Sequence, residues 1–367
     1  MSGRVTAQDV AKAAGVSPAT VSLVFHNRPG VKAETRARVL ALAESLGYKQ
    51  AAPTALPAQA RTLLLITYKQ QGSAISEMPF FEHLTRGITD QTRALGNHRL
   101  LVSYFYAEQD AQQQIDDLRA LGCDGAILLA TEMHASDVDA FEALGTPVIL
   151  LDSCFGSKPL DSVVIDNYRG AKTAVRYLHG LGHTRIGYLH CTADLKNFRE
   201  RRSGYLAAMR KLQDKGAGVE QLIIEGGPAI DDCYQAMCGF LDEHPTPSDG
   251  LPTAFFADND HAAALCVRAL QEHGLDVPND VSVVGFDDIE FAASLNPPLT
   301  TMAVPQESMG ELAVKRLADL IDNNTRASVR ICVQPELVVR SSARPPRAAA
   351  ELRNQPHGRE RSAPCTN

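Results

Sequence analysis

The stretch "DVAKAAGVSPATVSLVFHNRPGVKAETRARVLALAESLGY", residues 9–48, contains three helical patterns separated by short turns. The first pattern ends at Gly15, and glycine is typical of the position after a helix. Ser17 can cap the second pattern because its hydroxyl accepts a backbone N–H, and Pro18 suits the first helical position, where no N–H is required. Two helices joined by a tight turn that contains glycine are typical of a helix-turn-helix, whose second helix enters the major groove of DNA.

The apolar positions of the three patterns have helical spacing. Thr6 and Asp9 fit a capping box at the start of the first helix, and Val21 and Val24 form the inward stripe of the second. The third helix is expected from about residue 33. Its inward-facing positions are Val39, Leu40, Ala43 and Leu46. A three-helix bundle that binds no ligand fits the same spacing, so both interpretations stay open at this point.

The charge of the chain is divided unevenly along its length. The formal net charge of the 367 residues is −7, yet residues 1–61 carry eight Lys and Arg against three acids, which is +5. The remaining residues therefore carry −12 (−7 − 5). A basic head on an acidic body favours contact between the head and phosphate, although a solvated basic face would have the same composition.

Length and apolar runs limit the class of protein. A chain of 367 residues is too long for one ordinary core, so two or three compact units are expected. The longest apolar runs, such as "TLLLI", are far shorter than the roughly 20 residues that span a bilayer, and the first residues lack the pattern of a signal peptide. We therefore expect a cytoplasmic protein without a membrane partner. The eight cysteines form no Cys-x-x-Cys pair, which favours buried free thiols over metal ligands, and no cofactor is predicted.

Apolar runs alternate with helical patterns from residue 62 onward. Nine runs, from "TLLLITY" to "VSVVGFDD", have the composition of strands, and segments such as "AKTAVRYLHGLGH" between them have that of helices. This alternation predicts parallel sheets flanked by helices, in two lobes with a ligand cleft between them. The sequence contains no Gly-x-Gly-x-x-Gly, Gly-x-x-x-x-Gly-Lys-Ser/Thr or Gly-x-Ser-x-Gly motif, so it favours a binding protein over an enzyme.

The segment "VTAQDVAKAAGVSPATVSLVFHNRPGVKAETRARVLALAESLGY" resembles the N-terminal domain of the lactose-repressor/galactose-repressor (LacI/GalR) family of bacterial transcription regulators. The resemblance implies a DNA-binding head at residues 1–49, with the recognition helix in the second pattern. The positions that it implies in DNA contact are Thr6, Ser17, Pro18, Ala19, Thr20, Ser22, Leu23, His26, Asn27 and Arg28.

Several of these positions depart from the family's common pattern. Leu23 stands where an arginine is frequent, so the two-bond contact of arginine with guanine should be missing. His26 replaces a common asparagine, and Pro18 and Ala19 can offer only apolar contact. We therefore expect an operator that is recognised through thymine methyl groups, DNA shape and phosphate contacts.

The connector at residues 50–61, "QAAPTALPAQAR", is unusual for the family. Family members form a short hinge helix here, and a leucine from each partner wedges into the minor groove. Leu56 is the wedge available in this chain. Pro57, however, falls in the second turn of a helix begun at Pro53, where it costs about 3 kcal/mol. An extended Pro/Ala linker therefore remains an alternative to a hinge helix.

The body resembles the periplasmic sugar-binding fold that this family carries. The matching segments include "VVIDNYRGAKTAVRYLHGLGHTRIGYL", "ERRSGY" and "DVSVVGFDDIEFAASLNPPLTTMAVPQESMG". The resemblance implies an effector-binding and dimerisation domain in two lobes at residues 62–341, and a structural role for His183. Acids and amides directly after strands are the polar groups that a sugar cleft needs. The positions implied around the effector are Phe80, Phe81, Asp152, Arg201, Asn259 and Asp287.

The effector itself is less closely defined. Core packing explains Phe80 and Phe81 as well as ligand contact does. Pro228 and Gln306 stand where the lactose-responsive members carry aromatic rings, so the stacking platform for a sugar is reduced. A sugar or sugar phosphate is the expected effector, while a purine or no small molecule at all remains open.

Taken together, these features predict an all-α helix-turn-helix head followed by an α/β two-lobed sensor. The predicted function is that of a transcription regulator, expected to be a repressor, which binds double-stranded operator DNA as a homodimer and responds to an effector between the lobes. A solute-binding protein for a transporter would share the body but would require a signal peptide and no basic head. Residues 342–367 are expected to be disordered.

Overall fold

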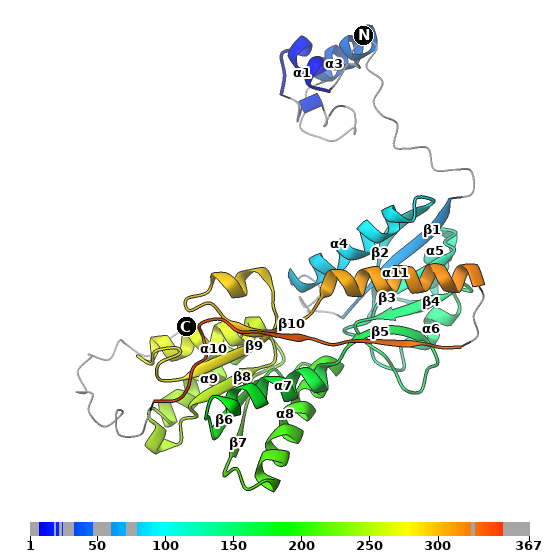
Figure 1. Ribbon diagram of the computed structural model, residues 1–367. Helices are drawn as coiled ribbons and strands as arrows, with labels where there is room; N and C mark the ends of the chain where they lie inside the picture. The colour runs from blue at the N-terminus through cyan, green and yellow to red at the C-terminus, as the bar shows by residue number, and fades with distance from the viewer. Residues whose placement is uncertain are drawn as a thin grey trace. The chain divides into compact units, whose positions relative to one another are not determined.

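The computed structural model describes residues 7–17, 20, 21, 24, 33–46, 60–70, 79–323 and 327–347 (Figure 1). The chain divides into two units, Met1–Ala60 and Arg61–Asn367, each with a core of its own. Within the described residues, no helix is both long and apolar enough to cross a bilayer.

The first unit contains the helices α1 (Ala7–Ala14) and α3 (Ala33–Ser45). Residues 20, 21 and 24 are also helical. Gly15 follows α1 with a φ of 64°, a value that glycine adopts without strain, so the predicted end of this helix is confirmed. The core of the unit consists of Val10, Ala11, Ala14, Val21, Val24, Val39 and Ala43.

Two leucines of the third helix do not join this core. Leu40 is 44% exposed and Leu46 is 40% exposed, whereas Val39 and Ala43 are buried. The prediction that all four face inward was therefore wrong. Val39 and Ala43 are four residues apart and fill the narrow contact stripe. Leu40 is the next residue after Val39, so the turn of the helix points its side chain away from this stripe.

The N-cap of the second helical pattern is formed as predicted. The hydroxyl of Ser17 accepts the backbone N–H of Thr20 at 3.1 Å, and the carbonyl of Ser17 accepts the N–H of Val21 at 3.2 Å. The Ser17 and Thr20 hydroxyls lie 2.9 Å apart. Ser17 therefore satisfies one of the backbone donors that a helix start leaves free.

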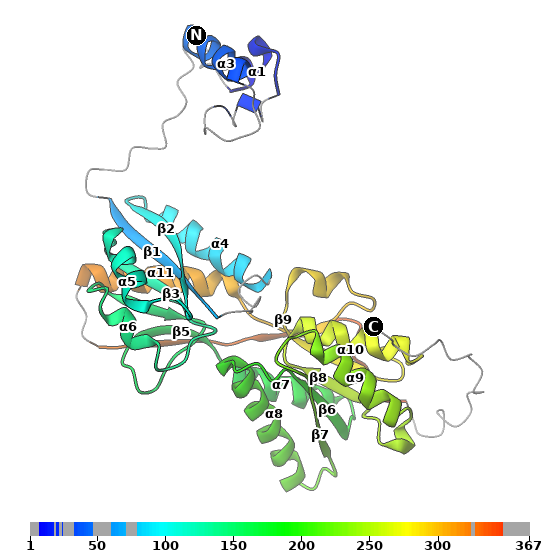
Figure 2. The same cartoon turned by 180° about the vertical axis from the view of Figure 1, so that it is seen from behind.

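The second unit has two lobes, each built on a six-stranded sheet (Figures 1 and 2). In the first lobe the order is β11-β5-β4-β3-β1-β2, and all neighbours are parallel. Its strands are β1 (Arg61–Lys69), β2 (His98–Tyr106), β3 (Gly125–Leu129), β4 (Val148–Leu151), β5 (Asp161–Ile165) and β11 (Arg330–Val333). Its helices are α4 (Pro79–Ala94), α5 (Ala111–Ala120), α6 (Val138–Glu142) and α11 (Gln306–Asn323).

The sheet of the second lobe has the order β12-β10-β9-β8-β6-β7. Its strands are β6 (Arg185–His190), β7 (Glu220–Glu225), β8 (Ala254–Ala257), β9 (Ser282–Asp287), β10 (Thr300–Ala303) and β12 (Glu336–Val338). Its helices are α7 (Asn167–Gly180), α8 (Lys196–Asp214), α9 (Asp232–Glu243) and α10 (Asp260–Glu272), with 3₁₀ helices η2 (Pro247–Asp249) and η3 (Glu290–Ser294).

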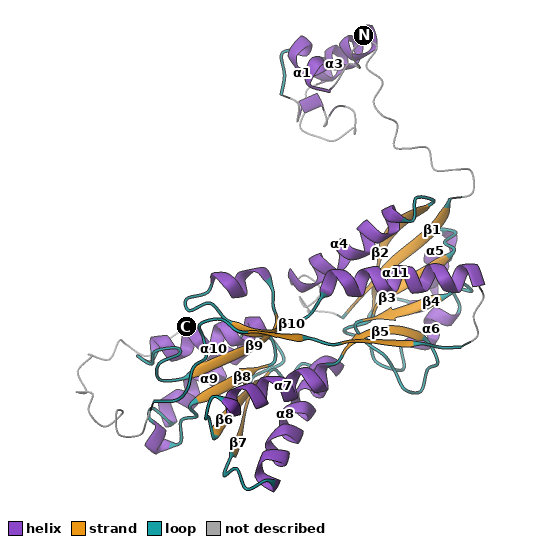
Figure 3. Ribbon diagram, viewed as in Figure 1, coloured by secondary structure: helices purple, strands orange, loops and turns teal. Residues whose placement is uncertain are grey.

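Alternate side chains of the central strands face different helical layers. In β1, Leu63 and Leu65 pack in the cluster that contains α4 and α11, while Leu64 and Ile66 pack with α5 and α6. This burial on both faces is typical of parallel strands covered by helices, and it explains the nearly continuous apolar run. All nine predicted runs are strands, and Figure 3 shows helices on both faces of each sheet.

One strand pair departs from the predicted parallel arrangement. β12 runs antiparallel to β10, whereas the other described pairs of this sheet are parallel. The chain passes from β11 in the first lobe to β12 in the second through only two residues. It has no helical crossover there that would return β12 to the parallel direction.

Among the described residues, three chain segments connect the lobes. The chain passes from β5 to α7 at residue 166, from β10 to α11 at residues 304–305, and from β11 to β12 at residues 334–335 (Figure 1). Short connections of this kind can act as hinges, because a few terminal residues absorb the change in φ and ψ.

The expected disorder from residue 342 onward is wrong for the first six residues of that segment. Ser342 is fully buried, and its hydroxyl accepts the N–H of Thr300 at 2.8 Å. The carbonyl of Arg344 lies 2.9 Å from Nε2 of His183, which is itself buried as the structural role predicts. These contacts fasten residues 342–347 to the second lobe, and the remainder of the tail lies outside the described residues.

Candidate functional site

A cavity lies between the two lobes. The first lobe contributes residues from α4 and from the ends of β3 and β4, and the second contributes residues from α8, α10 and the end of β9. Its lining consists of Phe80, Phe81, Thr131, Asp152, Leu195, Asn197, Phe198, Arg201, Ile230, Asn259 and Asp287. The structure thus brings all six effector positions of the sequence analysis to one site.

Asp152 is the central acid of the first lobe. It directly follows β4, and its φ of 67° is unusual for a residue other than glycine. Its Oδ2 accepts hydrogen bonds from the hydroxyl of Thr131 at 2.7 Å and from Nδ2 of Asn197, across the cleft, at 2.9 Å. Its Oδ1 is buried without a hydrogen-bond partner among the described residues. Burial raises the pKa of Asp152 to about 7.

Arg201 is held rigidly on the opposite lobe. Its Nε donates to Asn167 Oδ1 at 2.8 Å, its Nη1 to the Asp258 carbonyl at 2.5 Å, and its Nη2 to Asp287 Oδ1 at 2.9 Å. The guanidinium carbon also lies 3.8 Å from the centre of the Phe286 ring. These contacts orient the remaining N–H groups of Arg201 before any ligand arrives.

Asp287 and Asn259 complete the polar wall of the second lobe. Asp287 ends β9 with a φ of 105°, and burial raises its pKa to about 6 although Arg201 opposes the shift. Asn259 is the N-cap of α10, because its Oδ1 accepts the N–H of Ala262 at 2.8 Å. Its capping role and its place in the cavity are therefore compatible, since Nδ2 can still donate to a ligand.

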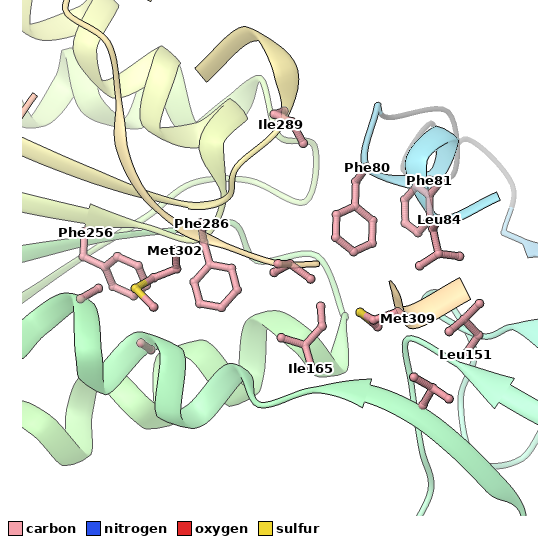
Figure 4. Close-up of a cluster of buried hydrophobic side chains, with 14 of the residues drawn as sticks. Phe80, Phe81, Leu84, Leu151, Ile165, Phe256, Phe286, Ile289, Met302 and Met309 are labelled. Atoms are coloured by element: carbon pink, nitrogen blue, oxygen red, sulfur yellow. The ribbon is translucent and has the colours of Figure 1, made fainter. Parts of the chain in front are cut away.

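Phe80 and Phe81 serve the core and the cavity at once. Their rings meet edge to face with centroids 5.1 Å apart, and both side chains are more than 90% buried. They belong to the same apolar cluster as Phe286 and Met309, which Figure 4 shows around them. Their position is therefore compatible with both interpretations that the sequence left open, and contact with a ligand stays a prediction.

Five lining residues were not predicted. These are Thr131, Leu195, Asn197, Phe198 and Ile230. Thr131 lies two residues beyond β3, so it could have been identified, like Asp152, as a polar residue that follows a strand. Asn197 lies four residues before Arg201 on α8, and helical spacing could have placed it on the same face.

Pro228 and Gln306, which replace the expected rings, do not line the cavity. Gln306 instead donates from Nε2 to the carbonyl of Asp287 at 2.8 Å, so it supports the turn after β9.

The DNA-contact positions are only partly described. Ser17 is exposed and Thr20 is half-buried at the start of the second helix of the head. The other predicted contact positions lie outside the described residues. They are Thr6, Pro18, Ala19, Ser22, Leu23, His26, Asn27, Arg28 and Leu56.

Comparisons with known proteins agree with both units. Residues 6–50 match the family model of bacterial regulatory proteins of the lacI family, and residues 175–343 match that of the periplasmic binding protein-like domain. The ribose operon repressor of Escherichia coli (strain K12) is 33% identical over 346 residues, covering 92% of this chain and 99% of that protein.

Two solved structures have the same architecture. The complex of the transcriptional regulator CelR with cellobiose has a TM-score of 0.67 at 27% identity, and the lac repressor dimer bound to operator and an anti-inducer has 0.65 at 26%. Each comparison covers 93% of this chain and 100% of the other. These proteins are DNA-binding regulators and not enzymes. This chain therefore belongs to the lacI family of bacterial regulatory proteins, as a two-lobed, effector-controlled transcription regulator.

Proposed function

We propose that the effector of this repressor is a neutral, hydroxyl-rich molecule of monosaccharide size, bound between the lobes. The observation that carries the proposal is Oδ1 of Asp152, a buried acceptor in the cavity wall without a partner among the described residues. A buried polar atom without a hydrogen bond costs about 1–3 kcal/mol. A ligand hydroxyl that donates to this oxygen would remove that cost.

The charges around the cavity favour a neutral effector over a sugar phosphate. Two carboxylates, Asp152 and Asp287, line the cavity together with one guanidinium, Arg201. That guanidinium is already paired with Asp287. A phosphate would therefore enter a buried site that has no unpaired cation in its lining, and burial of an uncompensated charge is strongly unfavourable.

The chemistry of the cavity wall favours a sugar ring. Phe80, Phe198 and Ile230 supply apolar surface for the C–H faces of a ring, while the acids and Asn259 face its hydroxyl groups. The ribose operon repressor and the cellobiose complex among the similar proteins support a carbohydrate.

Ligand and operator are coupled through the movement of the lobes. An effector held by Asp152 of one lobe and by Arg201 and Asp287 of the other binds best when the lobes are closed. Because binding equilibria are reciprocal, the effector changes operator affinity by the same factor by which operator changes effector affinity. We place this coupling in the cytoplasm, where the operator DNA lies.

Thermal unfolding of the full-length protein tests the effector. The panel contains neutral pentoses and hexoses, a disaccharide, a sugar phosphate, and purine bases and nucleosides. One neutral monosaccharide is expected to raise the unfolding temperature, whereas its phosphate ester should leave the unfolding temperature unchanged. Stabilisation by a purine or a phosphate alone would contradict the proposal, and stabilisation by no compound would favour the effector-independent alternative.

We also propose that the protein is a homodimer that pairs through β2. This strand lies at the edge of its sheet and exposes Val102 by 55%, Tyr104 by 50% and Tyr106 by 39%. Their spacing of two residues puts all three on one face. Such an apolar stripe on an edge strand is costly in a free monomer, and a second copy of the same strand would cover it.

A further inference from the structure

Two buried cysteines lie side by side behind one wall of the effector cavity. Cys191 directly follows β6, and Cys233 is the second residue of α9. Their side chains are 1% and 0% exposed, and both sulfurs lie against the same loop, Cys233 at Gly226 and Cys191 at Gly227. Neither residue has a role in the site described above.

The loop between β7 and α9 brings the two thiols together. Sγ of Cys191 lies 3.5 Å from the carbonyl oxygens of both Gly227 and Pro228. A Cβ on Gly226 would lie 2.7 Å from Sγ of Cys233, so only glycine permits this approach. The N–H of Thr192 donates to the Gly227 carbonyl at 3.1 Å, which holds the loop against the Cys191 segment.

We propose that Cys191 and Cys233 form a modification site, at which a small peroxide converts the two thiols into a disulfide. Two thiols held against the same loop need only a short movement to reach the S–S distance of about 2.05 Å. The backbone on both sides is already linked by the glycine loop. The same loop leads through Ile230, a residue of the cavity lining, into α9.

The reaction assigns different roles to the two sulfurs. A side-chain hydrogen bond from Cys233 lowers the pKa of Cys191, and donating that bond raises the pKa of Cys233, so Cys191 is the nucleophile. Its thiolate attacks one peroxide oxygen, breaks the O–O bond and becomes a sulfenic acid. The Cys233 sulfur then attacks the sulfenic sulfur and expels hydroxide, which takes the Cys233 proton. Two thiols lose two electrons, and one hydrogen peroxide becomes two waters.

Burial limits which oxidants can react. Neither thiol presents enough surface for a bulky disulfide reagent, so a small neutral peroxide is the suitable class. The exposed Cys332 serves as an internal comparison, because any thiol reagent can reach it. The alternative is that both cysteines are inert core residues, as buried thiols often are.

Disulfide mapping of the full-length protein decides between these possibilities. Reduced protein is treated with hydrogen peroxide, alkylated, and digested without reductant. Trypsin leaves Cys233, Cys238 and Cys266 in one peptide, because no Lys or Arg lies between residues 216 and 267. Chymotryptic cleavage after Tyr234 separates Cys233 from the other two. The expected product is a Cys191–Cys233 cross-link that lacks two hydrogens and is reversed by reductant.

Four variants sharpen the result. Cys191→Ser and Cys233→Ser should each abolish the cross-link, while Cys266→Ser, which removes the neighbouring buried thiol, should retain it. Gly226→Ala should slow formation of the cross-link, because the added Cβ separates the thiols. This variant keeps both cysteines, so it tests the proposal even if a cysteine variant folds poorly. Free thiols at 191 and 233 under conditions that oxidise Cys332, or a cross-link between Cys233 and Cys266, would overturn the proposal.

A consequence for sensing rests on the proposed function. The cross-link ties the segment that leads into α8, which carries Asn197 and Arg201, to the segment after Ile230. Oxidised protein should therefore gain a smaller shift in unfolding temperature from the effector than reduced protein does. An unchanged effector shift with a mapped cross-link would refute only this consequence, because the mapping does not depend on the effector.

Discussion

At the scale of single residues, the geometry of Asp152 is the central property of the cavity. Thr131 and Asn197 both donate to Oδ2, so this carboxylate is fixed while Oδ1 remains available. The Asn197 bond crosses from one lobe to the other. Asp152 is therefore expected to contribute both to closure of the lobes and to the recognition of a donor on the ligand.

Replacing Asp152 by Asn should weaken binding of the effector. The amide keeps the size of the side chain but loses the charge that strengthens the hydrogen bond from a ligand hydroxyl, which costs about 1.5–3 kcal/mol, or roughly 10- to 150-fold in Kd. Isothermal titration calorimetry measures the change. Asp139→Asn on α6, outside the cavity lining, is the matched control and should leave Kd unchanged. Equal affinity of the Asp152 variant and the original protein would exclude this role.

Effector affinity should rise with pH between about 6 and 8. Burial raises the pKa of Asp152 to about 7, so much of this group is protonated at pH 6 in the empty protein. A ligand hydroxyl donates to the ionised form, so binding lowers the pKa and releases a proton. The pKa of nearby Asp287 is raised to about 6, so this acid adds to the rise of effector affinity with pH. Arg201 opposes protonation of both acids.

Calorimetry in buffers of different ionisation enthalpy measures this proton release. The Asp152→Asn variant should show a flatter pH profile than the original protein, because Asp287 is then the one acid left in the described cavity lining. A profile that falls with pH, or one that the substitution leaves unchanged, is incompatible with this assignment.

At the scale of helices, close crossings depend on single glycines. A Cβ on Gly310 of α11 would lie 2.3 Å from the carbonyl oxygen of Leu84 on α4. Gly310→Ala should therefore destabilise the body by about 1–3 kcal/mol or more, because two backbones must separate. Gly239 in α9 has open space around it, and Gly239→Ala should instead stabilise by up to about 1 kcal/mol. Urea unfolding followed by circular dichroism compares the pair, and similar effects of the two substitutions would contradict the crossing argument.

The cap of the recognition helix gives a prediction for the head. Ser17→Ala removes the oxygen that accepts the N–H of Thr20, and loss of such a cap costs about 1 kcal/mol. Faster amide hydrogen exchange is expected around residues 20–24, with no change in the body. Ser45→Ala, in the last turn of α3, is the control, because its hydroxyl donates to the Leu42 carbonyl and caps no helix start among the described residues. Exchange that stays equally slow in both variants would show that Ser17 does not hold the helix.

At the scale of the whole molecule, the proposed dimer predicts that two heads bind the operator together. Tyr104→Lys on β2 would place a charge in the proposed pairing stripe, so a monomer is expected in light scattering after size exclusion. Operator affinity should fall steeply, because one head contacts too few phosphates at physiological salt. Val339→Lys is the control, because Val339 is 58% exposed in the second lobe. A Tyr104 variant that remains dimeric would place the interface elsewhere.

The sequence predicted the strands because their apolar runs are local. Parallel strands buried on both faces have continuous hydrophobic stretches, so β1 and β9 could be recognised without knowledge of their partners. Local chemistry likewise identified Gly15 and the Ser17 cap. Leu40 was misplaced because helical periodicity alone does not say how narrow the contact stripe is.

What the amino-acid sequence determined by itself is therefore the order of the first nine strands, the separate head and body, and the polar positions at strand ends, since these depend on neighbours along the chain. Only the tertiary structure decided that Asn197 reaches Asp152 across the lobes, that residues 342–347 pack on the second sheet, and that Cys191 lies against Cys233. These contacts join segments far apart in the sequence. Their geometry depends on packing distances between lobes and layers, which no local pattern encodes.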